Sequence, residues 1–239
     1  MDNPLHALAI TRQSGLRAEM NVIANNVANA GTAGFRREGV VFSEHVHAAR
    51  GGGSVAMAHA GARRIDPSPG IVEHTGAPLD LAIEGEGFFL LDGAEGPLLT
   101  RAGGFQRSPE GLLVASGGRP VLDAGGGTVF LPPDARDVTV AADGTLSVDG
   151  LEQARLGVYT AAPETLERVG DTAFRPREGV EPVPGARLIQ GALERSNVEP
   201  VSEIARMIAV GRAYEQMQTL IRDEDERIRE SIRTLGQQA

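Results

Sequence analysis

Two short clusters in the sequence have the residue types that acid–base or metal chemistry requires. His45 and His47 stand two residues apart, so a strand would place both imidazoles on one face. A zinc site needs a third or fourth ligand, and no spacing in the chain specifies one, so we expect surface histidines. Glu84 and Glu86 could likewise present two carboxylates on one strand face, as glycosidases require. No further acid stands out as their partner, and the glycines beside them suit a bulge or a close backbone approach.

Other catalytic or cofactor motifs are missing from the sequence. Residues 51–53 (GGG) lack the G-x-G-x-x-G pattern of phosphate-binding loops, and all 23 basic residues are Arg, so a P-loop lysine is impossible. There are no cysteines, which excludes disulfides, thiolate metal sites and cysteine nucleophiles. No G-x-S-x-G motif occurs. The sequence therefore predicts no catalytic residue, no cofactor, no metal site and no small-molecule substrate.

Composition narrows the class of partner. The chain has 239 residues, 41% of them apolar and 23% charged, which suits a folded core in one or two domains. A net charge of −9 and an aromatic content of 4% argue against nucleic acid, which needs basic contacts and stacking rings. No apolar run approaches the ~18 residues of a membrane span, so we expect no membrane insertion. The N-terminal residues have no basic cluster or apolar block, so we expect no cleaved signal peptide.

The elements that must position these residues include a predicted helix at each end of the chain. Most of the 31 Gly and 14 Pro lie within residues 51–186, which indicates helical ends around a turn-rich middle. In residues 1–34, Asp2 or Asn3 can cap a helix with Pro4 at its first position. In residues 196–239, Ser202 can cap a second helix of about nine turns. The apolar positions of this second helix recur every seven residues, at Met207, Tyr214, Ile221, Ile228 and Leu235.

The middle of the chain has the pattern of β structure. Short strands are predicted within residues 79–195, over 81–91, 98–106, 112–115, 128–131, 138–141, 145–148 and 154–160. Asp143-Gly144 and Asp149-Gly150 are hairpin signals. The fold class is therefore α+β, with a mostly antiparallel β domain that is a sandwich or an open barrel. Residues 35–78 hold one possible strand around Val40 to Val46 and too little apolar surface for a core, so we expect an extended arm or linker.

Three segments, in this order, resemble the flagellar basal-body rod and hook family. Residues 14–37 (SGLRAEMNVIANNVANAGTAGFRR) resemble its N-terminal helix, which ends in A-N-N-[IV]-A-N before a T-x-G-[FY] turn. Residues 78–122 contain LDLAIEGEGFFLL and LTRAGGFQRSPEGLLVASGGRPVL. Residues 190–235 contain N-V-x-P-V-x-E-[IM] and R-A-Y-E-x-x-Q elements like its C-terminal signature. The segments cover roughly half of the chain, and Ala33 departs from the Pro that many members have before the turn glycine.

The resemblance implies a structural, non-enzymatic subunit of the axial rod that crosses the periplasm and transmits motor torque. It implies other rod subunits as neighbours above and below, and export through the flagellar type III apparatus without a cleaved signal. It also implies that the terminal helices pair as a coiled coil in the inner tube and that the β domain lies outside. The short segment between Phe42 and Leu79 favours a proximal-rod subunit over a distal-rod one.

The apolar stripes of the two terminal helices are the expected assembly contacts. A helix of roughly 50 Å would overhang a β domain whose radius of gyration is about 13 Å, so its remainder needs another surface. The three asparagines at the end of the first helix are expected to form hydrogen bonds there. The predicted interface residues are Leu16, Met20, Ile23, Asn25, Asn26, Val27 and Asn29 of the first helix and Ile204, Met207, Tyr214, Met217, Ile221 and Ile228 of the second.

Two hypotheses from other classes stay open at this point. A periplasmic glycan hydrolase would use Glu84 or Glu86 as its acid, although the sequence shows no convergent polar pocket around them. A binding module tethered by a coiled coil would use the acidic middle of the chain to recruit a partner. Cleavage of peptidoglycan would identify the first, and a stable oligomer with helical ends would identify the second.

Overall fold

The computed structural model describes residues 4–48, 54–170 and 172–236, and the chain divides into two compact units. The helical unit comprises Met1–Ala28, Glu38–Arg64 and Glu199–Ala239. The β-rich unit comprises Asn29–Arg37 and Ile65–Val198. Two long helices and several small antiparallel sheets confirm the predicted α+β class, and the described strands form no closed barrel.

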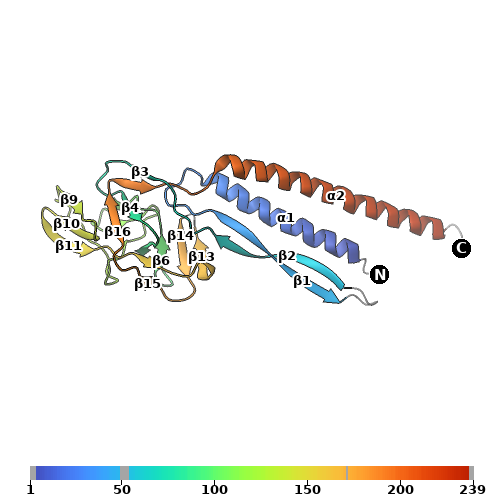
Figure 1. Cartoon of the computed structure of the whole chain (residues 1–239), viewed down its shortest axis with the longest axis horizontal. Coiled ribbons are helices and arrows are strands. Elements are labelled where there is room, and N and C mark those ends of the chain that lie inside the picture. The colour runs from blue at the N-terminus through green and yellow to red at the C-terminus, as the bar shows by residue number, and fades with distance from the viewer. Residues whose placement is uncertain (1–3, 49–53, 171, 237–239) are drawn as a thin grey trace. The chain divides into compact units, whose positions relative to one another are not determined.

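The helical unit contains α1 (Pro4–Ala28), α2 (Pro200–Gly236) and a two-stranded sheet of β1 (Glu38–Ala48) and β2 (Ser54–Ile65). Figure 1 shows α1 and α2 side by side and antiparallel, with α2 continuing past the N-terminal end of α1. The β1 strand lies beside α1. Neither helix, over the described residues, has a stretch apolar enough to cross a membrane.

Both helices begin with proline. Pro4 opens α1 as predicted, but α2 begins at Pro200, so the predicted cap at Ser202 is wrong. The backbone amide of Glu203 already donates to the carbonyl oxygen of Glu199 at 3.1 Å, which places Ser202 inside the first turn. Proline suits the first helical position because that position has no intrahelical acceptor for an N–H.

The β-rich unit is a set of short antiparallel pairings. Its four-stranded sheet has the order β13 (Leu166–Val169), β14 (Ala173–Pro176), β6 (Leu98–Thr100) and β5 (Phe89–Leu91). Its three-stranded sheet has the order β11 (Leu151–Arg155), β10 (Thr145–Val148) and β9 (Val138–Val140). The two-stranded pairs are β16 (Arg187–Gln190) with β4 (Leu81–Glu84), β17 (Ala192–Glu194) with β3 (Val72–His74), β12 (Tyr159–Thr160) with β15 (Glu181–Pro182), and β7 (Gln106–Arg107) with β8 (Leu113–Val114). A 3₁₀ turn, η1, covers Pro163–Thr165.

Several predicted strands are shorter than expected. Residues 81–91 are split into β4 and β5, because Gly85 and Gly87 turn the chain with φ of 92° and 119°, values that glycine adopts readily. Residues 98–106 and 154–160 are also split, and residues 128–131 form only isolated bridges. The backbone groups there bond to several short partners rather than to one long neighbour. By contrast, Asp149 and Gly150 join β10 to β11 with φ of 49° and 81°, as the hairpin signal predicts.

The segment expected to be an extended arm contains more pairing than predicted. The strand expected near Val40 is β1, whereas β2, which pairs with it, was not predicted. Pairing satisfies the backbone hydrogen bonds of a segment that has too few apolar residues to build a core. The GGG segment at residues 51–53 lies outside the described residues, as do the side chains of His45 and His47.

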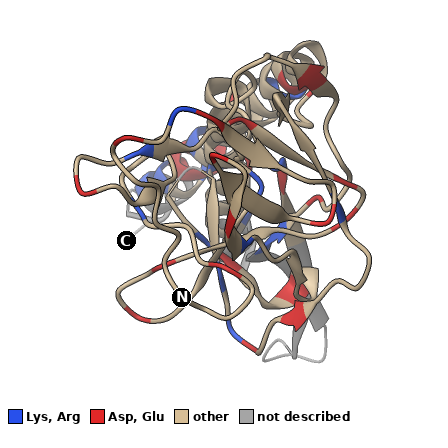
Figure 2. Ribbon diagram, turned by 90° about the vertical axis from the view of Figure 1, so that its left-hand side faces the viewer, with Lys and Arg blue, Asp and Glu red and all other residues tan. Residues whose placement is uncertain are grey.

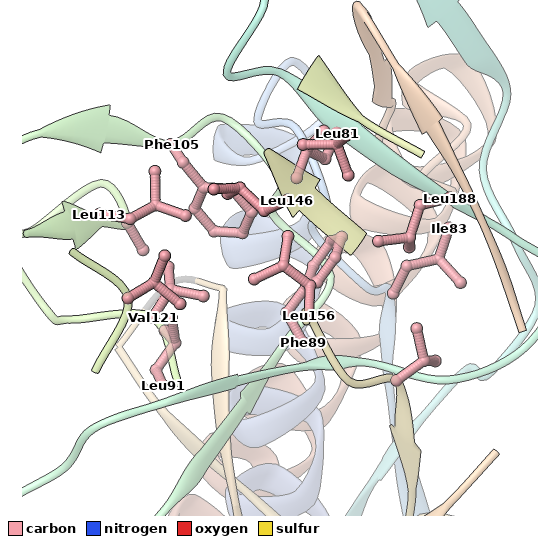
Figure 3. Close-up of a cluster of buried hydrophobic side chains, with 14 of the residues drawn as sticks. Leu81, Ile83, Phe89, Leu91, Phe105, Leu113, Val121, Leu146, Leu156 and Leu188 are labelled. Atoms are coloured by element: carbon pink, nitrogen blue, oxygen red, sulfur yellow. The ribbon is translucent and has the colours of Figure 1, made fainter. Parts of the chain in front are cut away.

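The main core of the β-rich unit gathers side chains from many of these short strands. Figure 3 shows ten of them directed toward one another: Leu81, Ile83, Phe89, Leu91, Phe105, Leu113, Val121, Leu146, Leu156 and Leu188. The rings of Phe89 and Phe105 meet edge to face, with centroids 5.1 Å apart. A second cluster contains Ile65, Phe88, Leu90, Leu99 and Phe174. Small sheets are therefore held together by shared side-chain burial more than by long strand ladders.

Two leucines at opposite extremes of exposure test this core. Leu146 in β10 is 0% exposed, so Leu146→Ala should lower the free energy of unfolding by about 2–5 kcal/mol, through lost burial and a cavity. The measurement is urea unfolding of the full chain, followed by circular dichroism. Leu151, which is 69% exposed on the neighbouring strand, is the matched control, and Leu151→Ala should change the value by no more than about 0.5 kcal/mol. Equal losses for the two variants would contradict this assignment of the core.

Candidate assembly interface

The two predicted apolar stripes meet within the chain, on the facing sides of α1 and α2. Leu16 and Ile23 of α1 and Val210 of α2 are buried in one cluster. The half-buried residues that surround this cluster are Met20, Val27, Met207, Ala213 and Tyr214. Six of the predicted interface residues therefore pack together inside the helical unit. Val210 and Ala213 join them from α2, because both follow the same helical spacing as Met207 and Tyr214.

A buried asparagine fixes the end of α1 against α2 and β1. Asn26 is 0% exposed, and its Nδ2 donates to the carbonyl oxygen of Glu38 at 2.8 Å and to Oε2 of Glu203 at 3.1 Å. Its Oδ1 accepts from the backbone amide of Glu38 at 3.0 Å. Three segments distant in sequence thus meet on one side chain. A buried carboxamide is stable only when its donors and acceptor are paired in this way.

Charged residues continue this contact along the two helices. Nη2 of Arg206 donates to Oε1 of Glu19 at 3.1 Å, and its Nη1 lies 3.6 Å from Oε1 of the buried Glu203. The pairs Glu19–Arg206 and Asn26–Glu203 set an antiparallel register for the helices. The sequence patterns did not indicate Glu203 as a contact residue, because a glutamate is rarely buried unless its carboxylate is paired.

The other two predicted asparagines lie nearby but contribute less to the helix contact. Asn29 accepts a hydrogen bond from the Thr32 hydroxyl at 3.2 Å, and the Thr32 amide donates to its carbonyl oxygen at 3.0 Å, so it shapes the turn after α1. Asn25 is half-buried on the last turn of the helix. The prediction that asparagines form hydrogen bonds where the helix ends is confirmed for Asn26 and Asn29.

The remaining predicted residues of α2 lie outside this buried cluster. Ile204 is 47% exposed and Ile228 is 37% exposed, while Met217 and Ile221 are half-buried. Glu203, the neighbour of Ile204, faces Asn26 instead, and successive helix positions are turned by about 100° from one another. Further large apolar side chains of α2 are exposed: Val201, Ile208 and Leu220. The second helix therefore has one apolar face on α1 and a second apolar face, formed by Val201, Ile204 and Ile208, in contact with solvent.

A buried arginine, which the sequence analysis missed, organises the β-rich unit. Arg101 is 1% exposed, and its guanidinium donates to the carbonyl oxygens of Gly87 at 2.5 Å, of Ile83 at 3.1 Å and of Gly85. Its Nε donates to Oε2 of Glu194. The two glycines singled out in the sequence therefore offer their carbonyl oxygens to an arginine side chain. Nothing in the local sequence distinguishes Arg101 from a surface arginine.

A second buried arginine shares the same carboxylate. Nη1 of Arg36 lies 2.6 Å from Oε1 of Glu194 and donates to the carbonyl oxygen of Ser68 at 2.5 Å. The amide of Gly70 also donates to Oε1 of Glu194, at 2.8 Å. Burial lowers the pKa of Arg36 below its usual value, although the Glu194 carboxylate opposes that shift. One glutamate thus connects β17 to the segments around residues 36, 70 and 101.

Glu84 and Glu86, the residues considered for catalysis whose side chains the structure describes, do not form a site. Glu84 has 60% of its side chain exposed and lies 3.4 Å from Nε of Arg187, and Glu86 is exposed on the turn after it. Among the described residues, no group of three or more His, Asp or Glu is arranged to hold a metal ion. Acidic and basic positions are interspersed over the loops in Figure 2. The candidate functional site is therefore the contact between α1 and α2, together with the exposed second apolar face of α2.

Comparison with known proteins returns matches along nearly the whole chain. Family models match in order: "Flagella basal body rod protein" at residues 8–36, "Flagellar hook protein FlgE/F/G D1 domain" at 82–148, and "Flagellar basal body rod FlgEFG protein C-terminal" at 189–234. The flagellar basal-body rod protein FlgF of Caulobacter vibrioides is 38% identical over 99% of both chains, and that of Mesorhizobium japonicum is 37% identical over 96% of both. The flagellar basal-body rod protein FlgG of Bacillus subtilis is 31% identical over 93% of this chain and 96% of its own.

The hydrogen bonds of Asn26 should stabilise the contact between α1 and α2. Asn26→Ala removes a buried hydrogen-bond partner from the Glu38 amide and from the Glu203 carboxylate, which costs about 1–3 kcal/mol. Hydrogen exchange of the α1 and α2 amides measures the loss as faster exchange. Asn21→Ala, at an exposed position of the same helix, is the control and should leave exchange unchanged or slower. Unchanged protection in Asn26→Ala would show that the polar contact is not stabilising.

Arg101 should be far more important than an exposed arginine of the same unit. Arg101→Met removes one partner of a buried ion pair and leaves Glu194 and three carbonyls short of donors, at a cost of about 3–5 kcal/mol. Urea unfolding measures this loss. Arg107→Met, at an exposed side chain, should cost less than about 1 kcal/mol. A loss of similar size in both variants would argue against a role for the buried network.

Proposed function

The chain belongs to the flagellar basal-body rod protein family, and we propose that it builds the rod by polymerising through its two terminal helices. It is a structural rod subunit and not an enzyme, and it associates with other rod subunits in the flagellar basal body. The single observation that carries the polymerisation proposal is the exposed apolar face of α2. The first face of this helix is occupied by α1, so the second face is free to contact a neighbouring subunit.

The length of α2 supports the same proposal. It has 37 residues against 25 in α1. At 1.5 Å per residue, α2 exceeds α1 by roughly 18 Å, and Figure 1 shows this continuation. Its seven-residue apolar spacing extends through Ile221 and Ile228. We propose that these positions continue as a coiled coil with helices of neighbouring subunits, since a heptad stripe is stable only against a partner helix.

The predicted interface residues divide into three groups under this proposal. Leu16, Met20, Ile23, Val27, Met207 and Tyr214 form the pair within one subunit, while Ile204, Met217, Ile221 and Ile228 contact other subunits. Asn25, Asn26 and Asn29 fix the end of α1. Under this proposal, the inner rod domain corresponds to the helical unit and the β domain to the β-rich unit. Of the arm predicted at residues 35–78, residues 38–64 lie in the helical unit and 65–78 in the β-rich unit.

A finer placement within the basal body is also proposed. Relatives named FlgF that match over nearly the full length of both chains support a proximal-rod subunit. A relative named FlgG at 31% identity leaves the distal rod as the alternative. We propose that the subunit lies in the part of the rod that crosses the periplasm, where it transmits torque, and that it reaches this place through the flagellar type III export apparatus.

The glycan hydrolase hypothesis has lost its support. Its candidate acid, Glu84, is exposed and lies beside Arg187, whereas a general acid needs burial or a neighbouring carboxylate to stay protonated near neutral pH. The proposed function instead depends on apolar contacts between this chain and other rod subunits.

Ile204→Asp should block rod assembly while leaving the subunit folded. The side chain is exposed in the subunit, and an acid near the start of a helix is favoured by the helix dipole, so folding should not suffer. Burying a carboxylate in an apolar contact between subunits costs several kcal/mol, so assembly should fail. The measurement is swimming in soft agar by cells that carry only the variant, with basal bodies examined by electron microscopy.

Gln216→Asp is the matched control, because it places the same charge at an exposed polar position of α2. This variant should swim normally. Circular dichroism of both purified variants should match that of the unchanged chain. Normal swimming by Ile204→Asp cells would contradict the proposed role of the second apolar face.

A further inference from the structure

The three-stranded sheet β9–β10–β11 has an open apolar pocket at one end. The pocket has a volume of about 440 Å³. Its apolar lining includes Ala142, Leu156, Val158, Val183, Ala186 and Leu188. The backbone there is already engaged, since the Leu156 amide donates to the carbonyl oxygen of Gly144 at 2.8 Å and the Val183 amide to that of Val158 at 2.8 Å. The lining therefore favours an apolar side chain over a ligand that needs many hydrogen bonds.

An exposed leucine projects from the opposite end of the same sheet. Leu151 is 69% exposed and follows the Asp149-Gly150 turn. In the register of β10 with β11, Val148 pairs with Leu151 at this end, and Thr145 pairs with Arg155 at the end where the pocket lies. The four residues of β10 span roughly 10 Å at about 3.3 Å per residue. Leu151 is therefore too far away to fill the pocket of its own chain.

The two ends of the sheet differ in charge. Beside Leu151, Glu152 and Asp149 are exposed, and the backbone amides of the exposed Arg136 and Asp137 donate to Oδ1 of Asp149 at 3.2 and 3.0 Å, so this end is acidic. The charged residues that line the pocket are Arg155, Arg187 and Asp143. Asp143 is partly satisfied by the amide and hydroxyl of Thr145, both at 3.1 Å, and Arg187 has Glu84 within 3.4 Å. Two acidic ends would repel each other, whereas the rim of the pocket, where two arginines are balanced by Asp143 and Glu84, does not repel an acidic end.

We propose that Leu151 of one copy enters the pocket of a second copy of this chain, so that β-rich units contact one another head to tail. The proposal rests on the proposed rod function, because it names a second contact through which the same subunits assemble. A contact between two different surfaces does not close on itself as a two-fold contact does, and repeated it generates a helical assembly. This is the geometry that a rod requires. The contact uses the β-rich unit alone and is independent of the exposed face of α2.

Cysteine cross-linking tests the proposal, because the natural chain has no cysteine. Cells without the natural copy express two variants together, Leu151→Cys and Ala186→Cys, and their basal bodies are purified and oxidised. Head-to-tail docking should give covalent dimers in the mixture and none from either variant expressed alone. Dimers from Leu151→Cys alone would show a two-fold contact and overturn the proposal.

The matched control pairs Ala186→Cys with Ile71→Cys, since Ile71 is 75% exposed elsewhere in the β-rich unit. This pair should give no dimers. Dimers in the same yield as from the Leu151→Cys mixture would show that cross-linking is nonspecific and would overturn the proposal. Absence of dimers in the Leu151→Cys mixture, with both variants present in the basal bodies, would also overturn it and would fit a small molecule in the pocket. That result would leave the rod function intact, whereas absence of the natural chain from basal bodies of swimming cells would overturn the rod function itself.

Should either cysteine variant fail to enter basal bodies, the swimming of cells that carry only Leu151→Ala tests the proposal instead. This variant keeps the subunit stable and should lower the swimming rate at least two-fold. An unchanged rate would overturn the proposal.

Discussion

The structure depends on the burial of apolar surface on a second helix that is longer than its partner. The stripe of α1, from Leu16 to Val27, covers one face of α2 around Val210. It leaves Ile204 and Ile208 exposed, and it ends before α2 does. Each large aliphatic side chain that stays in water forgoes about 1.5–3 kcal/mol. In the proposed assembly, this exposed surface of α2 is buried by neighbouring subunits.

Buried polar groups decide which apolar arrangement is adopted within each unit. Leucine, isoleucine and methionine contacts tolerate small slips of one helix along another, because burial is not directional. Asn26 does not tolerate them, since a shift of one turn would break its buried hydrogen bond to Glu203. In the β-rich unit, Arg101 has the same effect on the turn at Gly85 and Gly87. A subunit that transmits force benefits from contacts that fix position as well as contacts that provide stability.

The helices were predictable from sequence, and much of the β-rich unit was not. Helical periodicity, Pro4 and the heptad from Met207 to Ile228 are local signals, so they indicated both helices and the face of α2 that meets α1. The orientation of Ile204 could not be predicted from local sequence, because it depends on the buried partner of Glu203 on α1. The division of residues 81–91 into two strands likewise depends on Arg101, which is distant in sequence and binds the intervening carbonyls. The β2 strand was missed because its pairing with β1 needs no apolar core.

The two contacts proposed between subunits differ in what they can specify. A heptad stripe on α2 provides much apolar burial, but its seven-residue repeat allows a neighbour to bind in several registers that differ by two turns. A single leucine in a pocket provides little burial by comparison, yet it admits one position only. The acids beside Leu151 also oppose contact between two Leu151 ends. If both contacts form, the helices provide the stability of the polymer and the β-rich units select its register. This division explains why a rod subunit would keep an exposed leucine on a hairpin where a polar residue would serve a monomer equally well.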